Sequence, residues 1–183
     1  MEDASIKLGV MVFPPRAASA GLPARAHFIY ATNGMSERRM PCRVEPHGRP
    51  DWRVELLAYT SVEAPWVAEL LIEMARYPFI HGSGFAIGHT LPVQAGAQNL
   101  WHGYLLTKPR LEPATINPLV IDIGIGPDWV FHVQVFGLVG AELEEAIKIG
   151  DPAFAERYLP TTLPRETSFL DLRRKSVMLE GGS

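Results

Sequence analysis

The sequence predicts an α+β fold with a mixed, mostly antiparallel sheet and helices packed on one side of it. Three observations lead to this expectation. Strand-like stretches come first, one amphipathic helix follows, and further strands precede the last helices. This order lacks the regular strand–helix alternation of a parallel doubly wound sheet. The 183 residues are 47% hydrophobic and 20% charged, a balance that supports one packed domain and excludes a disordered chain.

The first third of the chain predicts strands separated by loops. Residues 1–26 are expected to form an irregular lead-in, because prolines and small residues dominate it, with one short strand at residues 6–13. Residues 27–32 are rich in aromatic and β-branched side chains, which is typical of a strand. Asn33-Gly34 then predicts a turn. Three prolines within residues 36–50 predict a polar loop.

A strand and the clearest helix of the sequence follow. Residues 52–59 alternate in the manner of a strand. Pro65 suits the first turn of a helix, and Pro78 is expected to end that helix because it disfavours the helical conformation of the residue before it. Between them, apolar residues recur at helical spacing and predict one buried stripe: Trp66, Leu70, Met74 and Tyr77, widened by Val67 and Leu71.

The second half of the chain predicts more strands and then two helices. A short strand is expected at residues 90–93 within a glycine-rich loop, another at 100–107, and a hairpin between 119–125 and 130–139. A helix is expected at 141–149, with Gly150 as its stop, and another at 151–158, which Asp151-Pro152 begins. We divide the chain into the lead-in, one domain at 27–177 and a tail at 178–183.

Composition excludes several classes of function. Seventeen basic and 20 acidic residues give a net charge of −3, so we expect neither nucleic-acid binding nor a polybasic membrane anchor. No apolar run is long enough to cross a membrane, and the first residues lack a signal peptide. The single cysteine, Cys42, excludes an internal disulfide. We therefore expect a cytoplasmic protein, which agrees with a lone cysteine.

Catalytic and metal-binding patterns are weak. The six histidines are scattered and form no metal-ligand motif, so we predict neither a metal nor a cofactor. His102 and His132 fall within strand patterns and are expected on sheet faces. An enzyme remains an alternative, in which His89 of the glycine-rich loop acts as a general base and Glu55 or Asp122 orients it. The simpler interpretation is that His89 only bonds to the backbone of its loop.

Two basic clusters are candidates for protein contacts. Arg38, Arg39 and Arg43 lie together in the first polar loop, and a second cluster occupies residues 173–175. Such clusters are most often solvated charge. Because arginine makes fork-like contacts at interfaces, the first cluster also fits an acidic protein partner.

The order and spacing of several motifs resemble the suppressor of fused domain family. A strand with Glu-Leu-Leu precedes a helix that begins near a tryptophan and ends in Ala-Arg-Tyr, and a Gly-His-Thr loop follows. The matching residues are Glu55-Leu56-Leu57, Trp66, Leu70, Met74-Ala75-Arg76-Tyr77 and Gly88-His89-Thr90. Weaker matches at 28–36, 136–143 and 171–177 extend the resemblance over most of the chain. Asn33 and Met35 depart from the family's aromatic and leucine.

The resemblance implies a suppressor-of-fused-like fold and a function in protein–protein contact without known catalysis. In animals this domain is half of a larger protein that binds Gli transcription factors and restrains hedgehog signalling. This chain resembles a bacterial stand-alone member, some of which are proposed to be immunity proteins that neutralise toxins. The loop at residues 36–50 does not align with the family residue by residue, so no binding residue is transferred. A homodimer through a sheet edge is a further alternative.

Overall fold

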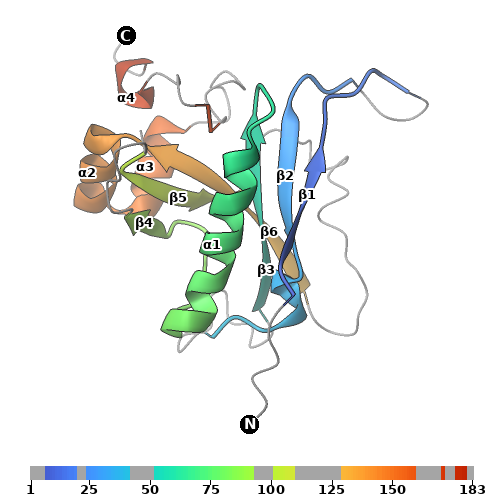
Figure 1. Ribbon diagram of the computed structural model, residues 1–183. Helices are drawn as coiled ribbons and strands as arrows, with labels where there is room; N and C mark the ends of the chain where they lie inside the picture. Colours follow the sequence, from blue (N-terminus) through green and yellow to red (C-terminus); the bar gives the residue numbers. More distant parts are fainter. Residues whose placement is uncertain are drawn as a thin grey trace.

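Six strands form one mixed sheet in the order β1-β2-β3-β6-β5-β4 (Figure 1). The computed structural model describes residues 7–19, 24–41, 52–92, 101–109, 129–159, 170–171 and 176–180. The strands are β1 (Gly9–Phe13), β2 (Phe28–Asn33), β3 (Trp52–Thr60), β4 (Thr90–Pro92), β5 (Gly103–Thr107) and β6 (Trp129–Leu138). The helices are the 3-10 helix η1 (Met35–Glu37), α1 (Pro65–His81), α2 (Gly140–Ile149), α3 (Asp151–Tyr158) and α4 (Val177–Glu180).

These elements confirm the predicted fold class and most of the predicted elements. Six expected strands correspond to β1 through β6, and the two expected late helices are α2 and α3. Gly150 ends α2 with a φ of 86°, as its position suggested. The expected strand at 119–125, and with it the hairpin to β6, lies outside the described residues. The short helix α4 was not expected.

The sheet consists of two antiparallel halves joined by one parallel pair. β1, β2 and β3 are antiparallel neighbours, as are β4, β5 and β6. β3 and β6 are parallel, with Glu55 opposite His132. Each half is three strands followed by a helix, α1 after β3 and α2 after β6. The two halves are therefore related by a rotation of 180° about an axis that runs between β3 and β6, parallel to both strands. This rotation also exchanges the two faces of the sheet.

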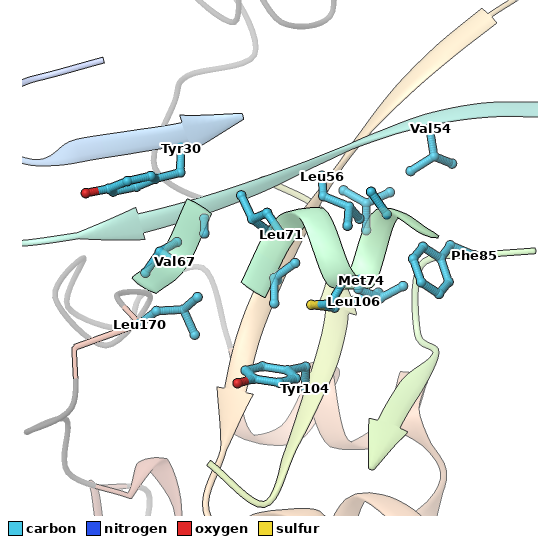
Figure 2. Close-up of a cluster of buried hydrophobic side chains, with 14 of the residues drawn as sticks. Tyr30, Val54, Leu56, Val67, Leu71, Met74, Phe85, Tyr104, Leu106 and Leu170 are labelled. Carbon is cyan, nitrogen blue, oxygen red and sulfur yellow. The ribbon is translucent and has the colours of Figure 1, made fainter. Parts of the chain in front are cut away.

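The prediction that all helices pack on one side of the sheet is wrong, because α1 lies on one face and α2 and α3 lie on the other. α1 covers the face formed by Val54, Leu56 and Leu106 (Figure 2). Leu105 alternates with Leu106 along β5 and therefore lies on the opposite face, where it packs with Phe136, Phe154 and residues of α2 and α3. The physical reason is the parallel pair, because the half-turn that relates the halves places their helices on opposite faces.

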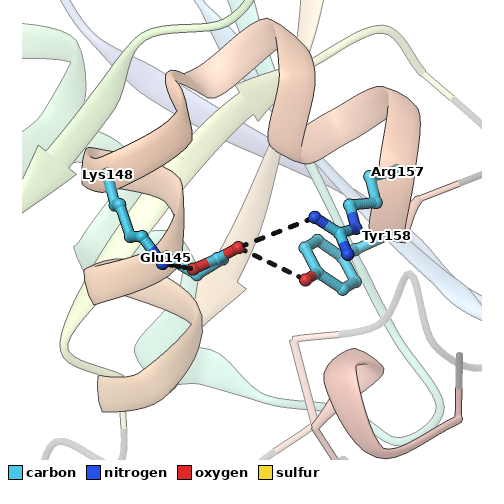
Figure 3. Close-up of polar contacts among 4 residues, drawn as sticks. All are labelled: Glu145, Lys148, Arg157 and Tyr158. Carbon is cyan, nitrogen blue, oxygen red and sulfur yellow. Dashed lines mark hydrogen bonds and ion pairs between the residues drawn. The ribbon is translucent and has the colours of Figure 1, made fainter. Parts of the chain in front are cut away.

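The helix pair α2–α3 is joined by a carboxylate between the two helices. Glu145 of α2 pairs with Lys148 Nζ at 3.6 Å and with an Arg157 nitrogen at 4.0 Å. It also accepts a hydrogen bond from the Tyr158 hydroxyl at 3.4 Å (Figure 3). Deeper, the buried Glu142 accepts hydrogen bonds from the Val139 and Val177 amides, so the start of α2 also holds α4.

α1 does not end before Pro78, in contrast to the prediction. It continues to His81 and ends at Gly82, whose φ of 64° is left-handed and whose amide donates to the Pro78 carbonyl. Proline removes one hydrogen bond and crowds the preceding turn, but Pro78 is itself buried against the core. The buried stripe is also rotated from the predicted one: Val67, Leu71, Met74, Ala75 and Pro78 are buried, while Tyr77 is 42% exposed.

Trp101 packs directly against the backbone of β6. A Cβ atom added to Gly137 would lie 2.6 Å from its indole ring, and that ring is 1% exposed. We therefore expect Gly137→Ala to destabilise the fold by about 1–3 kcal/mol through overpacking, measured by urea unfolding. Gly9→Ala is the matched strand control, because a Cβ there meets nothing within 4 Å. Equal stabilities of the two variants would contradict this account of the packing.

Candidate functional site

A buried carboxylate organises the turn that follows β2. Glu55 of β3 is 6% exposed. Its Oε1 accepts hydrogen bonds from the Gly34 amide at 3.2 Å, the Ser36 amide at 2.9 Å and the Ser36 hydroxyl at 2.7 Å. Its Oε2 accepts from the Thr32 hydroxyl at 2.5 Å. A capping side chain normally accepts the free amides at the start of a helix. For η1 this acceptor is Glu55, which is distant in the sequence.

Gly34 is required at this turn for two reasons. Its φ of 103° is left-handed, which disfavours every residue with a side chain. A Cβ atom there would also lie only 2.2 Å from the Lys7 carbonyl oxygen. The turn predicted at Asn33-Gly34 is therefore confirmed, and its geometry depends on the glycine and on Glu55 together.

The turn determines where the predicted arginines lie. Arg38 ends η1, with its amide near the Met35 carbonyl at 3.4 Å, and its side chain is half-buried, whereas Arg39 is exposed. Met35 and Met40, on either side of the pair, are buried in the core below α1. The two arginines are therefore carried on a segment anchored at both ends. Arg43 and Cys42 lie outside the described residues.

A second feature lies at the C-terminal end of α1. A pocket of about 290 Å³ is lined by Tyr77, Ser83, Gly84, Phe85, His89, Thr90 and Leu91. Tyr77 stacks on Phe85, with ring centroids 6.1 Å apart, and also contacts His81 at 4.3 Å. The family-like residues His89 and Thr90 therefore meet an exposed aromatic side chain. The sequence analysis predicted that Tyr77 is buried. Its position at the margin of the apolar stripe was the feature of the sequence that could have indicated its exposure.

The chain places this pocket and the arginine segment at the same end of the molecule. α1 runs back along β3, so its C-terminal end returns to the end of the sheet where β3 begins and β2 ends (Figure 1). Met40 joins the same buried cluster as Met74 and Phe85. Arg76, also on the last turns of α1, is exposed. Gly88, with a φ of 92°, donates its amide to the Leu106 carbonyl and so holds the loop beside β5.

The structure separates the residues proposed for the enzyme alternative. Glu55 lies on β3 and His89 precedes β4, and these strands are three positions apart in the sheet. That is about 14 Å at the usual strand spacing. Glu55 is already committed to the turn, and the described residues that line the pocket with His89 include no carboxylate. Glu55 therefore does not orient His89, and Asp122 lies outside the described residues.

His132 is the neighbour of Glu55 across the parallel pair. It lies on a sheet face, as predicted. Its Nδ1 is buried and has no hydrogen-bond partner. Burial lowers the pKa of His132, and the nearby charge of Glu55 offsets this only in part. His132 is therefore neutral at pH 7. Tyr104 is also poorly suited to proton transfer, because burial and the charge of Glu73 raise its pKa to about 12.

Two further features concern metal ligands and long apolar helices. Within the described part of the chain, no group of three or more histidine, cysteine, aspartate or glutamate side chains is arranged to hold a metal ion. In the same residues, no helix has the length and apolar character needed to cross a membrane. Trp66, another residue that matches the family motifs, is half-buried in the first turn of α1. It therefore lies at the opposite end of the helix from the pocket that contains His89.

Glu55→Gln tests the role of the buried carboxylate. The amide retains one acceptor but presents an NH₂ group to Thr32, so we expect a loss of about 1.5–3 kcal/mol of stability, as for hydrogen bonds to charged groups. We also expect faster hydrogen exchange at the Gly34 and Ser36 amides. Glu69→Gln is the control, because Glu69 is exposed on α1. Unchanged exchange at both amides would contradict the assignment.

Acidification tests the state of His132. Its folded pKa is lowered, so below about pH 6.5 the unfolded chain binds a proton that the folded chain refuses. Stability contributed by neutral His132 is therefore present above that pH and is lost as the pH falls towards the folded pKa. We expect His132→Gln to lose less stability than the native chain between pH 7.5 and 5.5, measured by urea unfolding (roughly the titration range of histidine). His81→Gln, at an exposed position, is the control for the loss of a histidine. If the stability of His132→Gln falls as steeply with pH as that of the native chain, the argument is refuted.

Comparisons with known proteins agree on the family. Residues 5–175 match the model of the suppressor of fused protein (SUFU) family. Among solved structures, the Sufu–Fu complex aligns with a TM-score of 0.60 at 16% identity, over 94% of this chain and 77% of that chain. Drosophila Suppressor of Fused gives 0.60 at 16% identity, over 94% and 43%. A suppressor of fused homologue from Neisseria gonorrhoeae FA 1090 gives 0.57 at 13% identity, over 93% and 88%.

No curated protein sequence matches the chain. The chain spans less than half of the Drosophila protein, and identities this low show a shared fold only. The family match, in contrast, covers nearly the whole sequence. The chain therefore belongs to the suppressor of fused family.

Proposed function

We propose that this protein is a non-catalytic protein-binding module whose binding surface lies at the C-terminal end of α1. The observation that carries the proposal is the exposure of large apolar side chains there. Tyr77 is 42% exposed and lines the pocket that contains His89, and Ile80, three residues further along α1, is 71% exposed. Exposed aromatic residues next to a pocket are typical of the central contacts of protein interfaces.

The sheet edge beside the pocket supports the same proposal. Among the strands that the structure describes, β4 lies at the edge of the sheet, and its residues Thr90 and Leu91 also line the pocket. An extended segment of a partner that pairs with β4 would therefore place a side chain over the pocket, which is a common mode of peptide recognition. Pro92 has no amide hydrogen and limits this pairing to a short segment.

Arg38 and Arg39 give the proposed surface its charge preference. Their segment is fixed by the Glu55 turn and by the two buried methionines, so less conformational entropy is lost when a partner binds. Guanidinium groups pair with carboxylates in a fork geometry. We therefore propose an acidic protein partner, with Arg43 of the same sequence cluster as a further contact.

A related fold and the family resemblance support a protein partner. A structure of the same fold is described as the Sufu–Fu complex, in which Sufu is assembled with Fu. We extend the proposal to an immunity-type role in the cytoplasm, in which the module neutralises its partner by covering it. No metal or cofactor is part of this proposal, and neither nucleic acid nor a membrane is the proposed target.

A native pull-down from source-cell lysate tests the surface. We expect a specific protein to be captured by the native chain and lost with Arg38→Glu/Arg39→Glu, because both changes repel an acidic partner. Tyr77→Ala should weaken capture independently of charge. Lys108→Glu/Lys148→Glu is the charge-matched control, since both side chains are exposed and the contact of Arg157 with Glu145 is retained.

Two results would contradict the proposal. One is equal capture by all variants, which would place the contact elsewhere. The other is an activity on a small-molecule substrate panel that His89→Ala abolishes, which would favour the enzyme alternative. Thermal unfolding of each variant establishes that it is folded before binding is compared.

A further inference from the structure

A larger pocket lies at the opposite end of α1, where the chain passes from β3 into the helix. Its volume is about 490 Å³, and it is lined by residues 61–66 and by Leu170 and Asp171. The wall is held in place by hydrogen bonds. The Ser61 amide donates to Asp171 Oδ1 at 3.0 Å, and the Leu170 amide donates to the Tyr59 carbonyl at 2.8 Å. Two distant parts of the sequence therefore form one pocket.

The lining combines an aromatic ring, several apolar residues and two carboxylates. Trp66 is half-buried, so its indole packs on the core while part of it faces the pocket. Leu170 is 1% exposed and packs beside Val67 (Figure 2). Glu63 and Asp171 carry negative charge, and none of the lining residues that the structure describes is a lysine, arginine or histidine. A tryptophan face and carboxylates both attract cations.

The start of α1 offers little to an anion, although helix N-termini often bind one. Pro65, the first residue of the helix, has no amide hydrogen. The Ala64 amide donates to the Tyr30 hydroxyl at 2.6 Å, and the Val67 amide donates to the Ala64 carbonyl at 2.9 Å. Most of the donors that would hold an anion are therefore absent or already engaged, which leaves the carboxylates to determine the charge preference.

We propose that this pocket receives an arginine side chain from a partner protein. A guanidinium group is planar, stacks on tryptophan and pairs with carboxylates through two hydrogen bonds, which suits this lining better than a lysine ammonium. The three methylene groups of arginine would lie against the exposed Pro65, as the stems of long basic side chains do on apolar surfaces. Val62 is 64% exposed at the same pocket and gives the polypeptide around that arginine an apolar contact.

This site is independent of the surface proposed above. α1 has 17 residues, so its two ends are about 25 Å apart. The proposed acidic partner of Arg38 and Arg39 would contact one end, and the arginine would enter at the other. The failure of either proposal leaves the other intact.

An NMR titration of the ¹⁵N-labelled full chain tests the pocket. The probe is the blocked tripeptide acetyl-Gly-Arg-Gly-amide, and its control is the citrulline peptide, which has nearly the same shape without the charge. We expect a saturable shift of the Trp66 indole N–H signal, with a dissociation constant on the order of 1–10 mM for a single side chain. The citrulline peptide should bind roughly tenfold more weakly or not at all.

Variants connect that signal to the pocket. Glu63→Gln should weaken arginine binding several-fold while leaving the fold unchanged, because Glu63 is exposed. Trp66→Leu should weaken binding of the arginine peptide, followed by the Ser61 and Val62 amide signals. Glu69→Gln, which removes an exposed charge of α1 that is not part of the lining, should bind like the native chain.

Four outcomes would overturn the proposal. The arginine peptide fails to shift the Trp66 signal, the citrulline peptide binds equally well, or Glu69→Gln weakens binding as much as Glu63→Gln. The fourth is binding that appears only after Arg173, Arg174 and Lys175 are replaced by glutamine, which would assign the pocket to this chain's own basic segment rather than to a partner.

Discussion

The parallel pairing of β3 with β6 is the constraint on which the rest of this structure depends. Every other strand pair in the described part of the chain is antiparallel and joins strands that are consecutive among those described. The parallel pair cannot be made by a short turn, so a long connection must separate the two strands. In this chain that connection contains α1, β4 and β5. That route places β1 and β4 at the two edges and puts α1 and α2 on opposite faces.

The same pair also brings polar groups into the middle of the sheet. Glu55 and His132 are neighbours there, and both are largely buried. Burying a carboxylate costs free energy unless hydrogen bonds compensate it, and for Glu55 those bonds come from the turn after β2. A central strand is thereby coupled to the surface segment that carries Arg38 and Arg39. The position of these arginines is thus a consequence of how the sheet satisfies one buried charge.

The sequence predicted the strands and helices well because local periodicity determines them. Val54, Leu56 and Ala58 do share one face, and Gly34 and Gly150 do adopt the left-handed φ expected at a turn and a helix end. What could not be predicted depends on distant contacts. The hydrogen bonds of Glu55, the pairing of Ser61 with Asp171 and the helices on both faces all require knowledge of which strands are neighbours. The predicted helix end before Pro78 was wrong for the same reason. Burial of Pro78 against the core offsets the local tendency of proline to end a helix.

The two ends of α1 differ in charge, and this difference follows from the fold. The C-terminal end carries Arg76 and lies at the same end of the molecule as the arginine segment, whereas Glu63 and Asp171 line the pocket at the N-terminal end. Because α1 is packed along its length on the sheet, the separation between the two ends is fixed. A partner that contacts both must present an acidic and a basic group at a matching distance of about 25 Å. Binding at one end would raise the effective concentration of the partner's second group at the other end, and affinity would increase. Because the rigid helix fixes the separation, only partners with a matching separation would gain this affinity.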